Sequence, residues 1–269
     1  MKLETLNLSH LEQTAYFSLL RNEFKVVTPR ILSQTLEIPR TRDTALLIAL
    51  ASKGALHRVG KGIYVVIPPD VLYKRKSFVQ DPYLVIHPLM MILERQYYVA
   101  YQSAAYLHGA AEQLPFTLTV VVTKQRRVIR LGSALIRFVT LKTEKFFGFE
   151  EIKYQDSPLI VSDIEKTILD CLDRFDLCGG IDEVIRTIGQ LTPHVNPHRL
   201  LGYLQRLQKP VVAQRLGLIL EQGDNPPHDL LTALTNLVSP YMYPLDPHSP
   251  HEGTRSARWN IIENVSIEV

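Results

Sequence analysis

Residues 27–66 read VTPRILSQTLEIPRTRDTALLIALASKGALHRVGKGIYVV, and this stretch decides how the rest of the chain is interpreted. Thr28 can cap a helix whose first residue is proline, where a missing amide hydrogen costs nothing. Pro39 ends that helix, because proline drives the residue before it out of the helical region. A second helix follows from about Thr41, and Gly54 supplies the left-handed residue that ends it.

A basic hairpin follows the two helices. Residues 55–59 predict a strand, the Gly-Lys-Gly run at 60–62 a tight turn, and residues 63–67 the return strand. An opening helix is expected over Leu6–Asn22, because Ser9 and Glu12 have the spacing of a capping box. This order of elements predicts a winged helix-turn-helix: an opening helix, two further helices joined by a short turn, and a hairpin.

That opening helix should pack behind the other two. Its apolar stripe is expected to consist of Leu11, Ala15, Leu19 and Leu20.

The side chains of this module favour a nucleic acid as its ligand. The candidate DNA contacts lie at the start of the first helix of the turn, in the first turns of the second helix and on the hairpin: Thr28, Arg30, Arg40, Thr41, Arg42, Thr44, Arg58 and Lys61. A helix that enters the major groove reads bases with its first turns, and arginine suits guanine and phosphate. The alternative is a solvated basic face on a small helical domain that binds protein.

The charge of the chain is unevenly distributed. Residues 1–78 contain 12 Lys and Arg against 6 Asp and Glu, a net charge of +6. Residues 79–269 contain 18 and 21, a net charge of −3, so the whole chain carries +3. A basic N-terminal module on a mildly acidic body predicts that one end of the molecule meets a polyanion.

Composition excludes several other classes of protein. With 46% hydrophobic and 21% charged residues, 269 residues can bury one large core or two ordinary ones.

Cys171 and Cys178 match no zinc spacing and are expected to be reduced and packed. The N-terminus has no signal-peptide core and no apolar run spans a membrane, so a cytoplasmic protein without membrane contact is expected. His248 and His251 are interpreted as loop residues, and no metal or cofactor is predicted.

An Asp-Pro pair places the domain boundary near residue 80, giving domains at 1–80 and 81–269. After a helix over residues 83–93, strands are expected at about 116–161, arranged as a meander of roughly five strands in an antiparallel sheet. Helices are expected at about 162–238, followed by a loop and a last strand. The predicted fold class is α+β, a winged helix-turn-helix followed by a mixed α/β domain with a helical C-terminal part.

The run VSDIEKTILDCLDR at residues 161–174 contains several acidic residues and a lysine. Ser162 and Glu165 have capping-box spacing, which accounts for both without catalysis. The alternative is a nuclease-like acidic site formed by Asp163, Glu165, Lys166 and Asp170. The capping explanation is preferred, His108 is interpreted as a structural histidine at a helix end, and no catalytic residue is predicted.

Four segments in fixed order give the chain a resemblance to a known family. They are KGALHRVGKGIYVV, QSAAYLHGAAEQLP, VSDIEKTILDCLDR followed by Gly-Gly, and QRLGLILE before a segment ending RWNIIENV. Together they cover most of residues 20–265, and the pattern resembles the AbiEi-type antitoxins of type IV abortive-infection systems. Residues 239–250 depart from it.

The resemblance implies an antitoxin that represses its own operon by binding inverted-repeat operators in double-stranded DNA. It also implies a nucleotidyltransferase-like toxin as functional partner, countered without a stable complex. The alternative is a DNA-targeted enzyme, a nuclease or nucleotidyltransferase relative that the winged domain delivers to DNA. None of the 13 glycines falls in a GxGxxG or GxxxxGK pattern, which favours the antitoxin.

Overall fold

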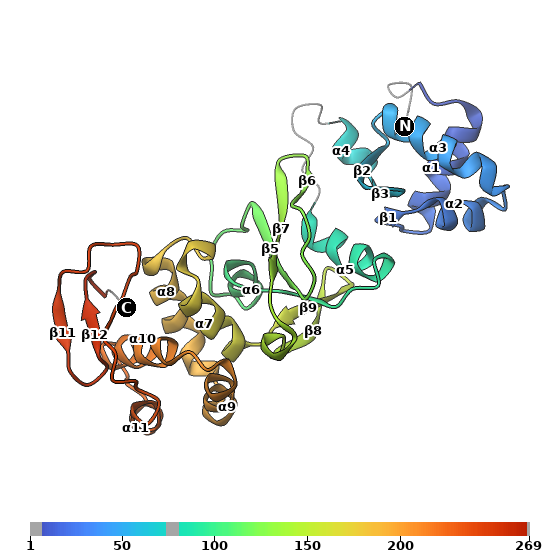
Figure 1. The fold of residues 1–269 in the computed structure, drawn as a ribbon. Helices are drawn as coiled ribbons and strands as arrows, with labels where there is room; N and C mark the ends of the chain where they lie inside the picture. The colour runs from blue at the N-terminus through green and yellow to red at the C-terminus, as the bar shows by residue number, and fades with distance from the viewer. Residues whose placement is uncertain (1–6, 74–80, 268–269) are drawn as a thin grey trace.

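The computed structural model describes residues 7–73 and 81–267, which form a mixed α and β structure. In Figure 1 an N-terminal module, a central sheet and a C-terminal helical part with a small sheet follow one another along the molecule. The module consists of α1 (His10–Arg21), β1 (Val26–Val27), α2 (Pro29–Leu36), α3 (Arg40–Ser52), β2 (Leu56–Gly60) and β3 (Ile63–Val66). Its three strands form an antiparallel sheet in the order β1-β3-β2.

Helix α1 confirms the predicted capping box. The Glu12 amide donates to Ser9 Oγ (3.4 Å), and the Ser9 amide donates to Glu12 Oε2 (2.6 Å). The prediction that Leu11 is buried was wrong, since 46% of it is exposed. Glu12 takes an inward position instead, because Lys53 Nζ lies 2.6 Å from its carboxylate and pairs with it. Leu6 lies outside the described residues.

The ends of α2 and α3 follow the sequence signals. The Ile31 amide donates to Thr28 Oγ1 (3.3 Å), which makes Thr28 the cap of α2. Glu37 takes a left-handed conformation (φ +53°) where α2 ends, and α3 begins directly after Pro39.

The central region is a six-stranded mixed sheet, not the predicted antiparallel meander. Its elements are α4 (Pro69–Tyr73), α5 (Pro82–Ile92), β4 (Tyr97–Val99), α6 (Gln102–Leu107), β5 (Thr117–Val122), β6 (Ile129–Leu131), β7 (Ala134–Thr140), the 3-10 turn η1 (Thr143–Lys145), β8 (Phe149–Tyr154) and β9 (Ser157–Ser162). The strand order is β6-β7-β5-β4-β9-β8, with β5 parallel to β7 and β4 parallel to β9. The meander failed because β4, which precedes α6 in the chain, lies between β5 and β9.

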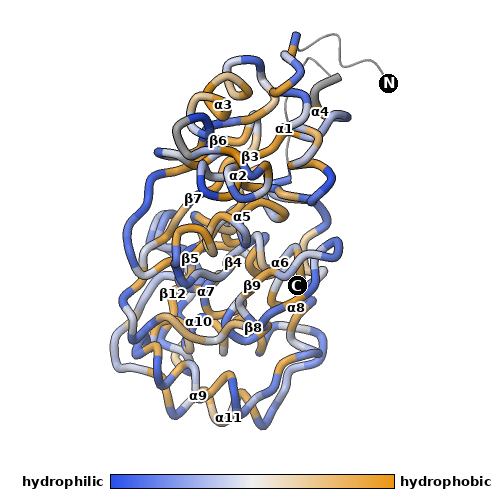
Figure 2. The backbone as a smooth tube through the Cα atoms, turned by 90° about the vertical axis from the view of Figure 1, so that its right-hand side faces the viewer, coloured by the Kyte–Doolittle hydropathy of each residue, from blue (hydrophilic) through white to orange (hydrophobic). Residues whose placement is uncertain are grey.

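Both faces of this sheet are covered. Leu118 and Val120 point to the side of α5, whereas Val121 points to the side of α7. Phe146 and Phe147 are buried in the segment after η1, Gly148 turns the chain at φ +71°, and β8 begins at Phe149. The hydrophobic segments run through the interior of the molecule in Figure 2.

The C-terminal part is helical, as predicted. It contains α7 (Ile164–Asp173), η2 (Phe175–Leu177), α8 (Ile181–Leu191), η3 (Thr192–His194), α9 (Pro197–Leu207), α10 (Pro210–Glu221) and α11 (His228–Thr235). Cys171 and Cys178 are buried free thiols, and the hydrogen bond between them raises the pKa of Cys171 above its usual value. No described helix is long and apolar enough to cross a membrane.

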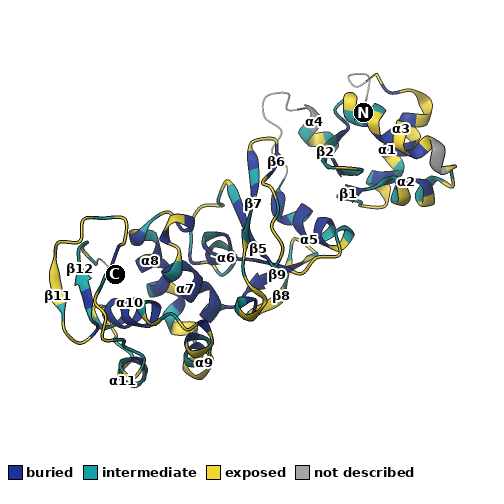
Figure 3. Cartoon of the chain, in the orientation of Figure 1, coloured by how far each residue is buried: buried dark blue, intermediate teal, exposed yellow. Residues whose placement is uncertain are grey.

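The tail after α11 is a packed element, whereas a loop with one last strand was expected. Its strands β10 (Tyr243–Pro244), β11 (Thr254–Ser256) and β12 (Ile261–Glu263) form a sheet in the order β10-β12-β11. Trp259 is fully buried, and α10 appears buried along most of its length in Figure 3. Gln214 on α10 donates to the Trp259 carbonyl (2.9 Å), so the tail is fixed to α10.

Gly217 is the position that lets Trp259 pack against α10, because a Cβ there would lie 2.1 Å from the indole ring. We therefore expect Gly217→Ala to lower the free energy of unfolding by about 1–3 kcal/mol through overpacking. Gly202 on α9 is the matched control, since a Cβ there meets no heavy atom within 4 Å. Gly202→Ala should instead raise stability by about 0.5–1 kcal/mol through helix propensity. Urea unfolding of both variants measures this, and equal effects would contradict the packing assignment.

Candidate nucleic-acid interface

The hairpin tip and the start of α2 lie against each other. Gly62 has a φ of +66°, and a Cβ there would lie 3.7 Å from the Pro29 ring. Lys61 at the tip and Arg30 in the first turn of α2 are both exposed. The backbone of these two cationic residues therefore lies near the capped N-terminus of α2, and a cation and a helix N-terminus each favour an anion such as a phosphate.

Thr28 and Arg58 have roles within the module. The Thr28 hydroxyl is occupied by capping α2. Arg58 is exposed on β2, and its Nε donates to the Gly60 carbonyl (3.2 Å), which holds the side chain along its own hairpin. Arg58 therefore adds positive charge beside Lys61.

Helix α3 turns one face to the module's core and the opposite face outward. Leu47 and Leu50 are buried. Arg42 and Thr44 are exposed, and Thr44 Oγ1 donates to Asp43 Oδ1 (2.9 Å). The backbone of residues 40–41 belongs to α3, but the side chains of Arg40 and Thr41 lie outside the described part of the structure.

Ala45 and Ile48 also lie on the exposed face of α3. Ile48 is 54% exposed. The exposure of Ile48 could have been predicted from helical spacing. Positions 48 and 50 are about 200° apart on a helix with about 100° per residue, so Ile48 faces outward when Leu50 faces the core. The outward face of α3 therefore carries Arg42 and Thr44, which were predicted DNA contacts, and also Ala45 and Ile48, which were not.

The inner face of the module's sheet packs on the central region. Val26 and Val65 are buried in the same cluster as Leu89 of α5. His57 on β2 has its Nε2 2.8 Å from the carbonyl of Arg130 on β6, so this nitrogen donates. The sheet face is thus covered by the body, while the hairpin tip stays exposed.

The charged residues of α7 serve packing. The Lys166 amide donates to Asp163 Oδ1 (2.8 Å), so Asp163 caps α7. The predicted capping box of Ser162 and Glu165 was wrong, because helix α7 begins one residue later than that box requires. The Ser162 hydroxyl instead hydrogen-bonds to Thr167 Oγ1 (2.7 Å).

The carboxylates at the start of α7 connect it to α9. Glu165 accepts from the Asn196 amide (2.6 Å) and lies 3.2 Å from Arg199 Nε. Tyr203 donates its hydroxyl hydrogen to Asp163 Oδ2 (2.7 Å). The residues of the alternative acidic site are therefore engaged in joining helices.

Lys166 and Asp170 form a buried ion pair one helical turn apart. Lys166 is 1% exposed, and its Nζ lies over the rings of Tyr98 (5.5 Å) and Phe147 (5.3 Å). Burial raises the pKa of the Asp170 carboxyl, and the Lys166 ammonium opposes that shift. Asp170 Oδ2 has no hydrogen-bond partner among the described residues, so the pair depends on the single contact.

His108 lies where α6 ends, and its Nε2 is 2.7 Å from the Ser162 carbonyl, to which it donates. This contact ties α6 to the end of β9, which agrees with its interpretation as a structural histidine.

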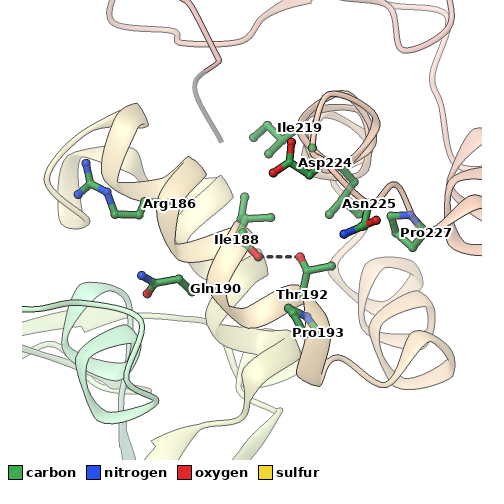
Figure 4. A pocket seen from close by; sticks show the side chains of 12 residues that line it. Arg186, Ile188, Gln190, Thr192, Pro193, Ile219, Asp224, Asn225 and Pro227 are labelled. Carbon is green, nitrogen blue, oxygen red and sulfur yellow. Dashed lines mark hydrogen bonds between the residues drawn. The ribbon is translucent and has the colours of Figure 1, made fainter.

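A hollow of about 360 Å³ opens between α8 with η3 and the loop from α10 to α11. Figure 4 shows Ile188, Ile219 and Pro227 around it, with Arg186 at the margin. Its polar groups do not converge: Thr192 donates to the Ile188 carbonyl (2.6 Å), and Arg186 pairs with Glu183. The described lining therefore lacks the paired acid and base that hydrolytic chemistry needs.

Residues 97–222 match the family model described as the AbiEi antitoxin C-terminal domain. A comparison with curated protein sequences gave no match. Among solved structures, the crystal structure of the RV2827C protein from Mycobacterium tuberculosis is similar with a TM-score of 0.70 and 16% identity, over 94% of this chain and 91% of that one. That likeness shows a shared fold, and its coverage extends over the N-terminal module as well.

The buried pair on α7 gives a direct test of its structural role. We expect Lys166→Met to lower the free energy of unfolding by about 3–5 kcal/mol, because it leaves a buried carboxylate without its cation. Lys166→Met with Asp170→Leu should recover most of that loss.

The difference between these two variants should depend on pH. Burial raises the pKa of Asp170, so the charged carboxylate is disfavoured in the folded state. The deficit of the single variant against the double one should be largest near neutral pH and shrink as Asp170 becomes protonated. Denaturant unfolding across a pH series measures it, and a deficit independent of pH would contradict the role of the ion pair.

Proposed function

We propose that this chain, whose residues 97–222 match the AbiEi antitoxin C-terminal domain, acts as the antitoxin of a toxin–antitoxin pair and represses its own operon. In this proposal residues 7–66 are a winged helix-turn-helix, with α3 as the recognition helix and the β2–β3 hairpin as the wing. The ligand is an inverted-repeat operator in double-stranded DNA. The toxin is a nucleotidyltransferase-like protein, which is countered without a stable complex.

The observation that carries the DNA-binding half is the position of the hairpin tip against the start of α2. It brings Lys61 and Arg30 together beside a capped helix N-terminus. The acidic side chains Glu12 and Asp43 are buried, and Glu12 is paired with Lys53, so the positive charge of the module dominates its surface. Phosphate contacts of this kind position a protein on DNA, while the helix in the groove reads the sequence.

Two observations support the antitoxin role. Residues 97–222 match the antitoxin domain, and the charged residues at the start of α7 are bound to other groups of the fold. Asp163, Glu165 and Lys166 each have a partner within the fold. The competing proposal, an enzyme delivered to DNA by the winged domain, needs these groups free to act on a substrate. We therefore propose a protein without catalytic activity.

Binding to DNA should weaken steeply with salt. The full chain should bind duplex DNA from upstream of its own reading frame, with a log–log salt slope of about −0.9 per neutralised phosphate. Lys61→Ala should reduce that slope by about one phosphate and weaken operator and scrambled DNA alike. Arg42→Ala should cost about 1–3 kcal/mol on the operator and little on scrambled DNA. Lys153→Ala is the matched control, since this exposed lysine lies on β8 of the body.

Fluorescence anisotropy on both DNAs across a salt series separates these effects. Affinity independent of salt would remove the DNA-binding proposal. Equal losses on both DNAs for Arg42→Ala would remove the assignment of α3 as recognition helix.

Protection from the toxin should not need the charged residues of α7. We expect the Lys166→Met, Asp170→Leu variant, which keeps the fold, to rescue growth of cells expressing the toxin as well as the wild type does. The measurement is colony formation with matched protein levels. A stable variant that loses protection would revive the enzymatic alternative.

A further inference from the structure

The exposed face of α3 is a strip without charge. Thr44, Ala45, Ile48 and Ser52 lie exposed along it, and Ile48 is the most apolar of them. From Asp43 to the end of the helix, the only charged residue is Asp43 itself, which is 2% exposed. A helix face in contact with water alone normally carries charged residues, so this strip has the composition of a surface that contacts another molecule.

Exposed cations lie at the start of α3 and on the neighbouring elements of the module. Arg42 lies on the flank of the strip in the first turn of α3, and Arg30, Lys61 and Arg58 are exposed on α2 and the hairpin. Glu37, in the turn between α2 and α3, is exposed as well. A neutral strip that begins beside Arg42 matches the DNA major groove, where base edges lie between two rows of phosphates.

We propose that Ile48, with Ala45 beside it, reads the C5-methyl group of a thymine in the major groove. The two residues are three positions apart, on the same helix face as Thr44, and apolar side chains recognise thymine through this methyl group. Ile48 is thus a specificity-determining residue, and the operator contains an A·T pair where it contacts the base. This inference rests on the proposed function of α3 as the recognition helix.

The test removes the methyl group and nothing else. Operator DNA from upstream of the chain's own reading frame is synthesised with one thymine at a time replaced by deoxyuridine. Wild-type full chain should bind about fourfold more weakly at one or two positions, the effect of losing about 0.8 kcal/mol for one buried methyl-sized group. Ile48→Ala should bind the unmodified operator more weakly by a similar factor and be insensitive to deoxyuridine at those positions.

Leu11→Ala is the matched control, because Leu11 is 46% exposed on α1 of the same module. It should bind the operator like the wild type and keep the wild-type response to deoxyuridine. Ile48→Ala should unfold at the wild-type temperature, since its side chain is exposed in the folded state.

Each other outcome has a distinct meaning. If the wild type binds the operator specifically but responds to deoxyuridine nowhere, or Ile48→Ala keeps the response, the methyl-reading inference is overturned while DNA binding stands. If the wild type does not distinguish operator from scrambled DNA, the proposed function itself fails. If Ile48→Ala changes the sedimentation of the free protein without changing DNA binding, the strip is a contact between copies of the chain, and the inference is overturned.

Discussion

A lysine ammonium enclosed by protein needs a carboxylate beside it, and α7 carries both groups where it packs against the sheet. Lys166 meets Asp170 on its own helix and the rings of Tyr98 and Phe147 from the sheet and the segment after η1. A Cβ on Gly148 would lie 2.9 Å from Lys166 and from Tyr203 of α9. The start of β8, α7 and α9 can therefore approach each other only with glycine at that position.

The carboxylates at the start of α7 extend the same constraint to α9. Asp163 holds the Tyr203 hydroxyl, and Glu165 holds the backbone amide of Asn196. Charged residues that have the composition of an acidic catalytic site here connect α7 to α9 within the helical part. Each of these carboxylates binds a group from another element that packs against α7.

The sequence predicted the parts of the fold that depend on neighbouring residues. The Ser9–Glu12 capping box and the Thr28 cap both formed where they were expected, because their partners lie three positions along the chain. The sheet order was not predictable in this way, since the three-residue β4 pairs with strands far along the chain. Nor was the role of Glu165, whose partners are 31 and 34 residues away. The candidate interface divides similarly: Arg30 and Lys61 were named from their charge, whereas Ile48 was not named because the DNA contacts were chosen among charged and hydroxyl-bearing residues.

The packing of the N-terminal sheet against α5 has a consequence for how such proteins diversify. Val26 and Val65 are buried with side chains beyond the sequence boundary near residue 80, and His57 bonds to β6. A recombination event that moved residues 7–66 alone into another protein would leave this apolar face uncovered. Because α5 and β6 are themselves packed into the central sheet, the module and the central region can be exchanged without loss of packing only as one unit. In the proposed function, a new operator preference is reached more easily by point substitutions on the outer face of α3, which leave this packing unchanged.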